Sequence, residues 1–325
     1  MAPTSGPVAI GCTIGLRLSI VVPCYNEEEV LPETLQRLQG TLDRLVALGK
    51  ISADSELILV DDGSRDGTWK LIREAHTRDR RFRGVKLSAN RGHQTALIAG
   101  LWAAGGDAVI SIDADLQNDL DAVEGMVDAH LSGHEIVYGV RRSRVTDTRF
   151  KRFSASAYYR VLALLGVRVV RDHADYRLLG RKALESLKQY QEVHLFLRGI
   201  VPLMGYRSTV VHYECAARFA GASKYPLRKM LALALDGITS FTAVPLRLIA
   251  VLGFAVSVLS LLMILWVLWL KLATTKALPG WASSVIPIYF LGGIQLLSIG
   301  VLGEYVAKLY IESKRRPRYF VEETL

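Results

Sequence analysis

The sequence predicts an α/β domain with a mostly parallel sheet, followed by interfacial helices and a two-helix transmembrane hairpin. Three observations lead to this fold class: apolar runs alternate with helical patterns in the first half, basic amphipathic stretches follow, and two long uncharged stretches lie near the C-terminus. Of the 325 residues, 50% are hydrophobic and 22% are charged. This composition excludes an intrinsically disordered chain, which has too few apolar residues to form a core.

Four short apolar runs, each bounded by turn residues, predict buried strands. They cover residues 18–23, 56–60, 84–87 and 108–112. Apolar residues at helical spacing predict helices between these runs, over residues 28–48, 68–75 and 94–104. Strands that alternate with helices form parallel sheets, and ligands bind at the carboxyl ends of such strands. The polar residues that follow the first, second and fourth runs are therefore expected at one edge.

Two carboxylates, Asp113 and Asp115, leave the fourth run two residues apart, and Gln117 follows them. Oxygen ligands of this kind suit Mg²⁺ or Mn²⁺, which would hold a diphosphate. A solvated acidic turn would explain an isolated pair, but Asp61 and Asp62 also end a strand. The sequence therefore predicts a metal site made by Asp113, Asp115 and Gln117.

Residues 61–64, Asp-Asp-Gly-Ser, fit either a plain turn or a site that accepts hydrogen bonds from a nucleobase or a ribose. The P-loop pattern, the dinucleotide pattern G-x-G-x-x-G after a strand and the hydrolase pattern G-x-S-x-G are absent. This argues against a P-loop NTPase, a dinucleotide oxidoreductase and a serine hydrolase. The three cysteines and seven histidines lack metal-ligand spacing, so the histidines are expected at the surface or hydrogen-bonded in the core.

Two uncharged stretches, residues 248–270 and 281–303, each have the roughly 20 residues that cross a bilayer. Two buried core helices are the alternative, although uncharged runs this long are uncommon in soluble domains. Basic residues outnumber the two lysines of the connecting loop, Lys271 and Lys276, on both outer sides. The positive-inside rule then places both termini and the large N-terminal part in the cytoplasm. Residues 1–17 lack the basic start of a signal peptide and are expected to be a flexible N-terminus.

The formal net charge of +9 suits an anionic partner: nucleic acid, anionic lipid or a phosphorylated substrate. Residues 150–167 and 225–244 mix basic residues with aromatic and aliphatic ones. This pattern is typical of helices that lie at a bilayer surface, although a core-facing helix explains the first stretch equally well.

Four motifs occur in order: V-P-C-Y-N-E at 22–27, D-D-G-S-R-D-G-T at 61–68, N-R-G-H-Q-T-A at 90–96 and D-A-D-L-Q at 113–117. Together they resemble glycosyltransferase family 2 with a GT-A fold. D-Y-R at 175–177, R-F-A-G-A-S-K-Y-P at 218–226, L-G-E-Y at 302–305 and R-P-R-Y at 316–319 are similar to the polyprenyl-phosphate glycosyltransferases, closest to the bactoprenol glucosyltransferase branch. Asn118-Asp119 departs from the family pattern, which often has proline as its second residue.

The resemblance implies a membrane-anchored, inverting enzyme that moves one sugar from a nucleotide diphosphate to polyprenyl phosphate. The residues implied at the nucleotide sugar are Pro23, Tyr25, Glu27, Asp61, Asp62, Asn90 and Asp113. Asp62 is the implied contact to the base, and Mg²⁺ or Mn²⁺ is the implied cofactor. The implied catalytic residues are Asp113, Asp115, Asp175 and Arg177, with Asp175 either orienting a group or acting as a base.

Cations are expected to bind the acceptor phosphate or the leaving diphosphate, although a solvated basic face would also explain them. The residues expected there are Arg141, Arg152, Arg177, Arg218, Ser223 and Lys224. The expected organisation is a flexible N-terminus (1–17), a cytoplasmic catalytic domain (18–217), an amphipathic juxtamembrane segment (218–245), two transmembrane helices (246–311) and a cytoplasmic tail (312–325).

A UDP-sugar, UDP-glucose above all, is the favoured donor. GDP-mannose, a UDP-N-acetylhexosamine and an aminoarabinose donor are the alternatives, and a homo-oligomer is left open. A membrane-anchored binder of anionic lipid or nucleic acid is the non-enzyme alternative. Many basic residues flank the two stretches, however, where topology already explains them, so no nucleic-acid partner is expected. Two spans without charged residues are too few to line a transport pathway.

Overall fold

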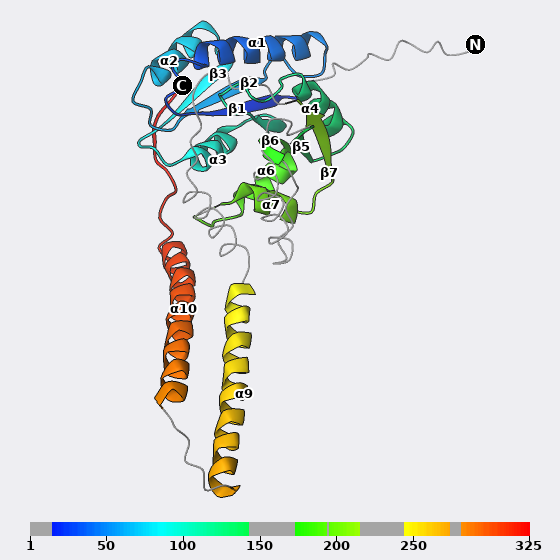
Figure 1. Cartoon of the computed structure of the whole chain (residues 1–325). Helices are drawn as coiled ribbons and strands as arrows, with labels where there is room; N and C mark the ends of the chain where they lie inside the picture. Colours follow the sequence, from blue (N-terminus) through cyan, green and yellow to red (C-terminus); the bar gives the residue numbers. More distant parts are fainter. Residues whose placement is uncertain (1–14, 143–172, 194, 215–243, 274–280) are drawn as a thin grey trace, which may run out of the picture. The chain divides into compact units, whose positions relative to one another are not determined.

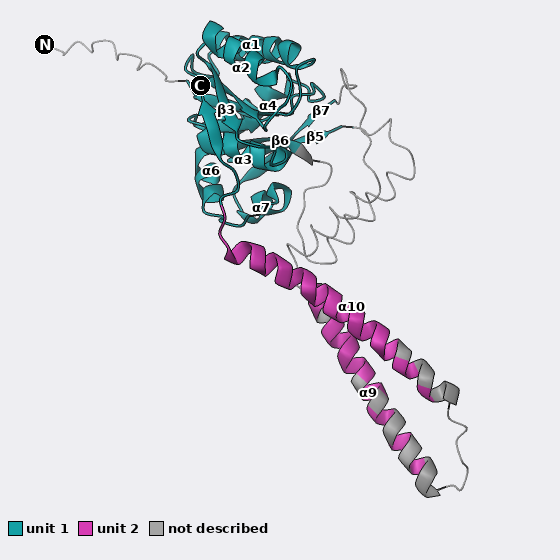
Figure 2. Cartoon of the chain, turned by 90° about the vertical axis from the view of Figure 1, so that its left-hand side faces the viewer, with its two compact units in different colours: residues 1–151, 170–223, 317–325 teal, residues 152–169, 224–316 magenta. Residues whose placement is uncertain are grey.

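The computed structural model describes residues 15–142, 173–193, 195–214, 244–273 and 281–325. The chain divides into two compact units, shown in Figure 2. The first unit consists of Met1–Lys151, Val170–Ser223 and Pro317–Leu325, and the second consists of Arg152–Val169 and Lys224–Arg316. The first unit contains one sheet with its helices, and the described part of the second contains two long helices.

Strands and helices alternate from residue 18 to residue 141 of the first unit (Figure 1). The strands are β1 (Leu18–Cys24), β2 (Glu56–Asp61), β3 (Phe82–Leu87), β4 (Ala108–Ser111), β5 (Ile136–Arg141), β6 (His173–Gly180), β7 (Ser208–Tyr213) and β8 (Val321–Thr324). The helices are α1 (Leu31–Ala47), α2 (Thr68–Arg78), α3 (His93–Ala103), α4 (Ala122–Leu131), α6 (Arg181–Lys188) and α7 (Leu197–Leu203). The four predicted strands and three predicted helices are all present, with ends that differ by a few residues.

The strands form one sheet in the order β7-β5-β6-β4-β1-β2-β3-β8. β1 pairs in parallel with β2 and β4, β2 with β3, and β5 with β7, whereas β6 and β8 are antiparallel to their neighbours. The predicted mostly parallel α/β sheet is therefore confirmed. Four of its strands, β5, β6, β7 and β8, were not predicted from the sequence.

Helices cover both faces of this sheet. Figure 1 shows α1 and α2 on one face and α3 on the other. The apolar side chains of α1 recur at helical spacing and are buried in one core cluster with β1 and β2: Leu31, Leu35, Leu38, Leu42 and Leu45. On the other face α3 approaches the sheet closely at Gly100, where an added Cβ would lie 2.3 Å from Val21 Cγ1. Only glycine fits at that contact.

The first helix begins later than the sequence predicts, at Leu31 instead of residue 28. Asn26 has a φ of 53°, so the chain turns sharply after β1. The backbone N–H groups of Glu27 and Glu28 then bond to the side chains of Thr68 and Asp66, at 2.9 and 3.2 Å. These bonds hold residues 26–28 against the loop after β2 and out of the helix.

The end of the chain is an edge strand of the sheet, although the sequence predicts a tail over 312–325. β8 pairs with β3, and ion pairs fasten it there. Glu323 lies 2.8 Å from Arg73 Nη2 and 3.1 Å from Trp69 Nε1, and Glu322 lies 3.0 Å from Lys86 Nζ. These partners are more than 200 positions away from Glu322 and Glu323 in the sequence, so no local sequence pattern predicts the strand.

The second unit contains α9 (Val244–Ala273) and α10 (Trp281–Ser313), which include both predicted spans, 248–270 and 281–303. Among the residues that the structure describes, one stretch is long and apolar enough to cross a membrane, Phe290–Ser313. A hairpin of two spans is therefore not confirmed and remains a prediction. The two predicted interfacial segments, 150–167 and 225–244, lie outside the described residues apart from Val244.

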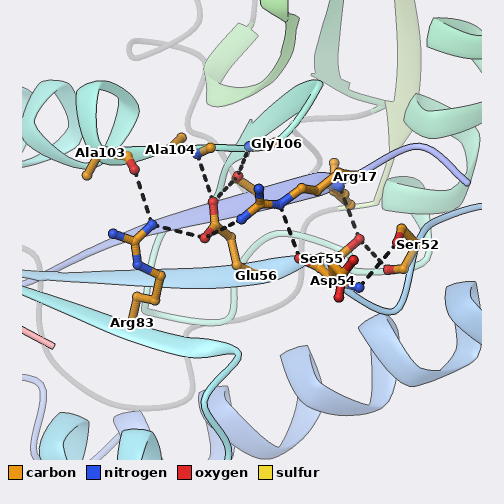
Figure 3. A network of polar contacts seen from close by, with 12 residues as sticks. Arg17, Ser52, Asp54, Ser55, Glu56, Arg83, Ala103, Ala104 and Gly106 are labelled. Carbon is orange, nitrogen blue, oxygen red and sulfur yellow. Dashed lines mark hydrogen bonds and ion pairs between the residues drawn. The ribbon is translucent and has the colours of Figure 1, made fainter. Parts of the chain in front are cut away.

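A buried carboxylate ties three strands together at the amino end of β2 (Figure 3). Glu56 is 3% exposed, and its Oε1 accepts hydrogen bonds from Ser19 Oγ at 2.7 Å and Gly105 N at 2.8 Å. Its Oε2 lies 3.0 Å from Arg83 Nη1 and 3.4 Å from Arg17 Nη2. Burial alone would raise the pKa of Glu56, but these hydrogen bonds and the charge of Arg83 outweigh it and lower that pKa.

Replacing Glu56 with Gln should destabilise the first unit by about 1.5 to 3 kcal/mol, because hydrogen bonds to a charged group are lost. A lowered pKa means that the carboxylate stabilises the fold at neutral pH. The difference between wild type and Glu56→Gln should therefore shrink as the pH falls below about 4.3, the usual pKa of a glutamate. Thermal unfolding of the full chain in detergent at several pH values measures this.

Glu33→Gln is the matched control, because Glu33 pairs with Arg37 on the exposed side of α1 at 2.7 Å. Such a surface pair contributes about 0.3 to 0.5 kcal/mol. Equal melting temperatures for the two variants at neutral pH would contradict the stabilising role of Glu56.

Candidate active site

The carboxyl ends of β1, β2 and β4 lie at one edge of the sheet because these strands are parallel neighbours. The chain order changes direction between β1 and β4, and in open α/β sheets ligands bind at such a point. β6 runs the other way, with Arg177 opposite Ser111 at the end of β4. Its first residues therefore reach the same edge. The predicted meeting of three loops is confirmed, and β6 adds a fourth segment.

Hydrogen bonds join the loops that follow β1 and β2. Asn26 N donates to Ser64 Oγ at 3.0 Å, and Arg65 N donates to Asn26 Oδ1 at 2.9 Å. The Tyr25 side chain beside them is 42% exposed, and Glu27 is half-buried. A tyrosine exposed on a fixed loop can stack on a flat ring.

Asp62 has a structural role that its motif did not reveal. Its two oxygens accept hydrogen bonds from the backbone N–H groups of Arg91 and Gly92, at 2.7 and 2.9 Å. Gly63, with a φ of 66°, completes this contact, because a Cβ there would lie 2.7 Å from Asn90 N. Burial raises the pKa of Asp62 despite these bonds. Asp62 thus holds the loop that carries Asn90 against the loop after β2.

Asp61 is the other member of this acidic pair and is fully buried. Its Oδ1 accepts a hydrogen bond from Ser64 N at 3.1 Å, while its Oδ2 has no hydrogen-bond partner in the described part of the chain. Burial raises the pKa of Asp61. Asp61 is therefore the carboxylate of this pair with an oxygen unpaired among the described residues, in a position that solvent does not reach, and the base contact implied for Asp62 stays a prediction.

The loop with Asp113, Asp115 and Gln117 is half-buried and held from within. Thr34 Oγ1 on α1 donates to the carbonyl of Ala114 at 2.8 Å, and Gln117 N donates to Asp115 Oδ1 at 3.2 Å. Leu116 has a φ of 58°, an unusual conformation for a branched side chain. The backbone turn that spaces the two carboxylates is thus fixed by a helix and by its own hydrogen bonds.

Two buried tyrosines hold the far end of the same loop. Tyr176 donates to the carbonyl of Asp119 at 2.9 Å, and Tyr213 donates to Asn118 Oδ1 at 3.2 Å. Their rings pack edge to face with centroids 5.1 Å apart. Arg141, a predicted acceptor ligand at the end of β5, has its Nε 3.3 Å from the Tyr213 hydroxyl. Asn118, where the sequence departs from the family pattern, is therefore an anchor of the loop.

His93 belongs to this site, although the sequence analysis placed no histidine there. Its Nε2 lies 2.9 Å from Asp113 Oδ1. Burial alone would lower the pKa of His93, but the hydrogen bond and charge of Asp113, together with Asp175, raise it. The contact joins the start of α3 to the end of β4, and the position of His93 inside N-R-G-H-Q was the available sequence signal.

Asp175 lies between two arginines at the start of β6. The Arg177 guanidinium contacts its Oδ1, and Arg198 on α7 approaches with Nη2 3.1 Å from Oδ2. Burial would raise the pKa of Asp175, but the two positive charges hold it well below its ordinary value. The sequence predicted Asp175 and Arg177, whereas Arg198 was missed.

The residues of the predicted metal site fit a divalent cation in part. Asp113 and Asp115 offer carboxylate oxygens on a fixed, half-buried loop, and Gln117 offers an amide oxygen. Within the described segments no group of three or more His, Cys, Asp or Glu side chains could hold a metal ion. Magnesium commonly uses one or two carboxylates, with water and substrate phosphates as the remaining ligands. The carboxylates of Asp113 and Asp115 suit a site that water and substrate phosphates complete, and not a site in which the protein supplies every ligand.

Most of the predicted site residues thus come together at this edge: Pro23, Tyr25, Glu27, Asp61, Asp62, Asn90, Asp113, Asp115, Gln117, Asp175 and Arg177. Four predicted acceptor ligands, Arg152, Arg218, Ser223 and Lys224, lie outside the described residues.

Known proteins are similar to this chain over most of its length. Residues 19–188 match the family described as "Glycosyl transferase family 2". An uncharacterized glycosyltransferase of Bacillus subtilis, YkoT, is 48% identical over 94% of this chain and 91% of its own length. The bactoprenol glucosyl transferase of Shigella phage SfV is 36% identical over 94% of this chain and 98% of its own.

Among solved structures, glucosyl-3-phosphoglycerate synthase from Mycobacterium tuberculosis is 20% identical, with a TM-score of 0.49, and covers 69% of this chain and 77% of its own. The relatives align over nearly the whole chain, and the family match spans β1 to α6 with every loop of the site. The chain belongs to glycosyltransferase family 2.

Proposed function

We propose that the chain transfers one glucose from UDP-glucose to polyprenyl phosphate, with inversion, at the cytoplasmic face of a membrane. One observation carries the proposal: the carboxylates of Asp113 and Asp115, which suit a metal diphosphate, lie at the same sheet edge as Asp175 and its partly exposed partner Arg198. The first suits a nucleotide-sugar donor, and the second suits an acceptor that is itself an anion. The 36% identity to a protein named bactoprenol glucosyl transferase supports the choice of sugar and lipid.

The donor would lie over the carboxyl ends of β1, β2 and β4. Tyr25 stacks on the base in this proposal, and Asp61 or Asp62 accepts its N–H group. Asp113, Asp115 and Gln117 would hold Mg²⁺ or Mn²⁺, which neutralises the charge of the leaving diphosphate. Glu27 and Asn90 border the same loops.

An oxygen of the acceptor phosphate forms a bond to the anomeric carbon, and the bond from that carbon to the donor diphosphate breaks. The electron pair of the broken bond leaves with UDP. The phosphate is already ionised at neutral pH, so no proton has to be removed from it. Positioning and charge neutralisation therefore supply most of the rate enhancement.

The acceptor phosphate is proposed to bind four basic residues and one serine that the family resemblance implies: Arg141, Arg152, Arg218, Lys224 and Ser223. Cations are needed there because two phosphate groups that approach each other in a low-dielectric site repel. Asp175 and Arg177 complete the catalytic edge of this proposal.

We further propose that α9 and α10 are two membrane spans with both chain ends on the cytoplasmic side. Large apolar side chains of both helices are exposed, such as Phe254 at 73% and Leu296 at 73%. Exposed apolar surface of this kind is typical of a membrane interaction. The excess of basic residues outside the two helices supports the orientation.

Asp115→Asn should lower turnover by roughly a hundred- to a thousandfold, as loss of a group that stabilises developing charge does. The variant keeps the shape of the side chain and loses the charge that a cation requires. Steady-state transfer assays measure turnover, and titration with Mn²⁺ in the presence of UDP measures metal affinity separately. Both quantities should fall.

Asp43→Asn is the control for this test. Asp43 is 53% exposed and pairs with Arg81, so its loss should leave transfer and Mn²⁺ affinity unchanged. Full turnover of Asp115→Asn, or of the wild type in excess chelator, would disprove the proposed metal dependence.

Topology can be tested with one engineered cysteine placed on either side of α9 and α10, in a variant that lacks Cys12 and Cys215 and keeps only the buried Cys24. Thr275→Cys lies between the two helices, and Ser313→Cys ends α10. In sealed, right-side-out vesicles an impermeant maleimide should label Thr275→Cys, and Ser313→Cys only after permeabilisation. Labelling of both, or of neither, in sealed vesicles would rule out the two-span arrangement.

A further inference from the structure

Two arginines with different environments share the Asp175 carboxylate. The Arg177 side chain is 2% exposed, whereas that of Arg198 is 39% exposed. Arg198 approaches Asp175 as a fork, with Nη2 3.1 Å from Oδ2 and Nε 3.4 Å from Oδ1. The carboxylate therefore has one partner in the protein interior and one partner that solvent reaches.

The interior partner explains why the carboxylate is there. Arg177 Nε and Nη1 are buried and have no hydrogen-bond acceptor among the described residues. A buried guanidinium is tolerated only with a counter-charge beside it. Asp175 supplies that charge, and it comes two positions earlier on the same strand, so both side chains lie on one face of β6.

This arrangement argues against Asp175 as a proton acceptor. The arginines hold its pKa well below the ordinary value, so the carboxylate binds a proton only weakly at neutral pH. A phosphate nucleophile also has no proton to give up. The residue is better suited to fix the position of another group.

Arg198 is the group whose position Asp175 fixes. Its guanidinium is half-buried and is held by the carboxylate of Asp175, and its charge acts on His93, which contacts Asp113. Arginine forms paired hydrogen bonds with phosphate, and a side chain held in place loses little entropy on binding. Arg198 therefore has the chemistry and the place of a phosphate ligand.

We propose that Arg198 binds the phosphate of the acceptor, and that Asp175 is a positioning residue that holds Arg198 in place. The inference rests on the proposed function and adds to it a residue outside the predicted set. Arg177 stays inside the protein and keeps Asp175 ionised.

The test compares Arg198→Ala, Arg198→Lys and the wild type in steady-state transfer to polyprenyl phosphate in detergent. Loss of one charge-assisted contact should raise the KM for polyprenyl phosphate by about ten- to a hundredfold in Arg198→Ala. Arg198→Lys, which keeps the charge, should recover part of this loss. UDP-glucose binding, measured by calorimetry, should stay within about twofold of wild type. Arg37→Ala, which removes an exposed arginine from α1, is the charge-matched control.

Asp175→Asn separates positioning from proton transfer. A positioning role predicts a raised KM for polyprenyl phosphate, with a pH profile of kcat like that of the wild type. A general base predicts a large fall in kcat and loss of the acidic limb of that profile, and this result would overturn the assignment. Because Arg177 loses its counter-charge, melting temperatures show which variants are folded, and Asp175→Glu replaces Asp175→Asn if the latter unfolds.

The outcomes also show whether Arg198 binds the acceptor phosphate or the donor diphosphate. They separate a failure of the Arg198 inference from a failure of the proposed function. Loss of UDP-glucose binding in Arg198→Ala with an unchanged acceptor KM would move the residue to the donor diphosphate and overturn the inference. Unchanged kinetics of Arg198→Ala, with an active wild type, would refute the role of Arg198 alone. A wild type that transfers no sugar to polyprenyl phosphate would instead refute the proposed function, and Arg198→Ala would then be compared for binding to micelles with polyprenyl phosphate. Equal binding there would refute the inference as well.

Discussion

The buried guanidinium of Arg177 is the constraint on which the catalytic edge of this protein depends. An isolated charge in a protein interior costs several kcal/mol, so Arg177 requires Asp175 beside it. Because the two residues are two positions apart on one strand and so lie on the same face, the requirement also orients β6. The hydroxyl of Ser111 bonds to the carbonyl of Asp175, which fastens β6 to β4 next to the carboxylates that follow that strand. The ion pair between Arg177 and Asp175 therefore helps to place the start of β6 next to the loop that carries Asp113 and Asp115.

The rest of the site is organised by a different kind of force. Around the proposed donor position, the loops are joined by hydrogen bonds to backbone groups: Asp62 to the loop at 90–92, and Asn26 to the loop at 64–65. At the start of β6, the main contacts are the ion pairs of Asp175 with Arg177 and Arg198. The two halves share the contact between His93 and Asp113. Salt screens exposed charges more than buried ones, so ionic strength acts more on the partly exposed Arg198 than on the buried Arg177.

The sequence was sufficient for the elements whose signal is local. The apolar run at 18–23 predicted β1, and acidic residues directly after such runs predicted the site loops. Where the signal is not local, prediction failed. β6 carries Asp175 and Arg177 in its middle, so it lacks an apolar run, and β8 is V-E-E-T, held by Arg73 and Lys86 from far away. Arg198 and His93 join the site only through side-chain contacts that the fold creates.

The discontinuous first unit has a consequence for biosynthesis. Residues 317–325 complete a unit that residues 1–151 begin, and α9 and α10 are encoded between them. A ribosome therefore finishes both long helices before β8 exists. Until then β3 has an open edge, with unpaired N–H and C=O groups that other chains can pair with. The nascent protein passes through a stage in which its two helices are complete and its sheet is one strand short, and ribosome pausing in that interval prolongs the exposure of the edge.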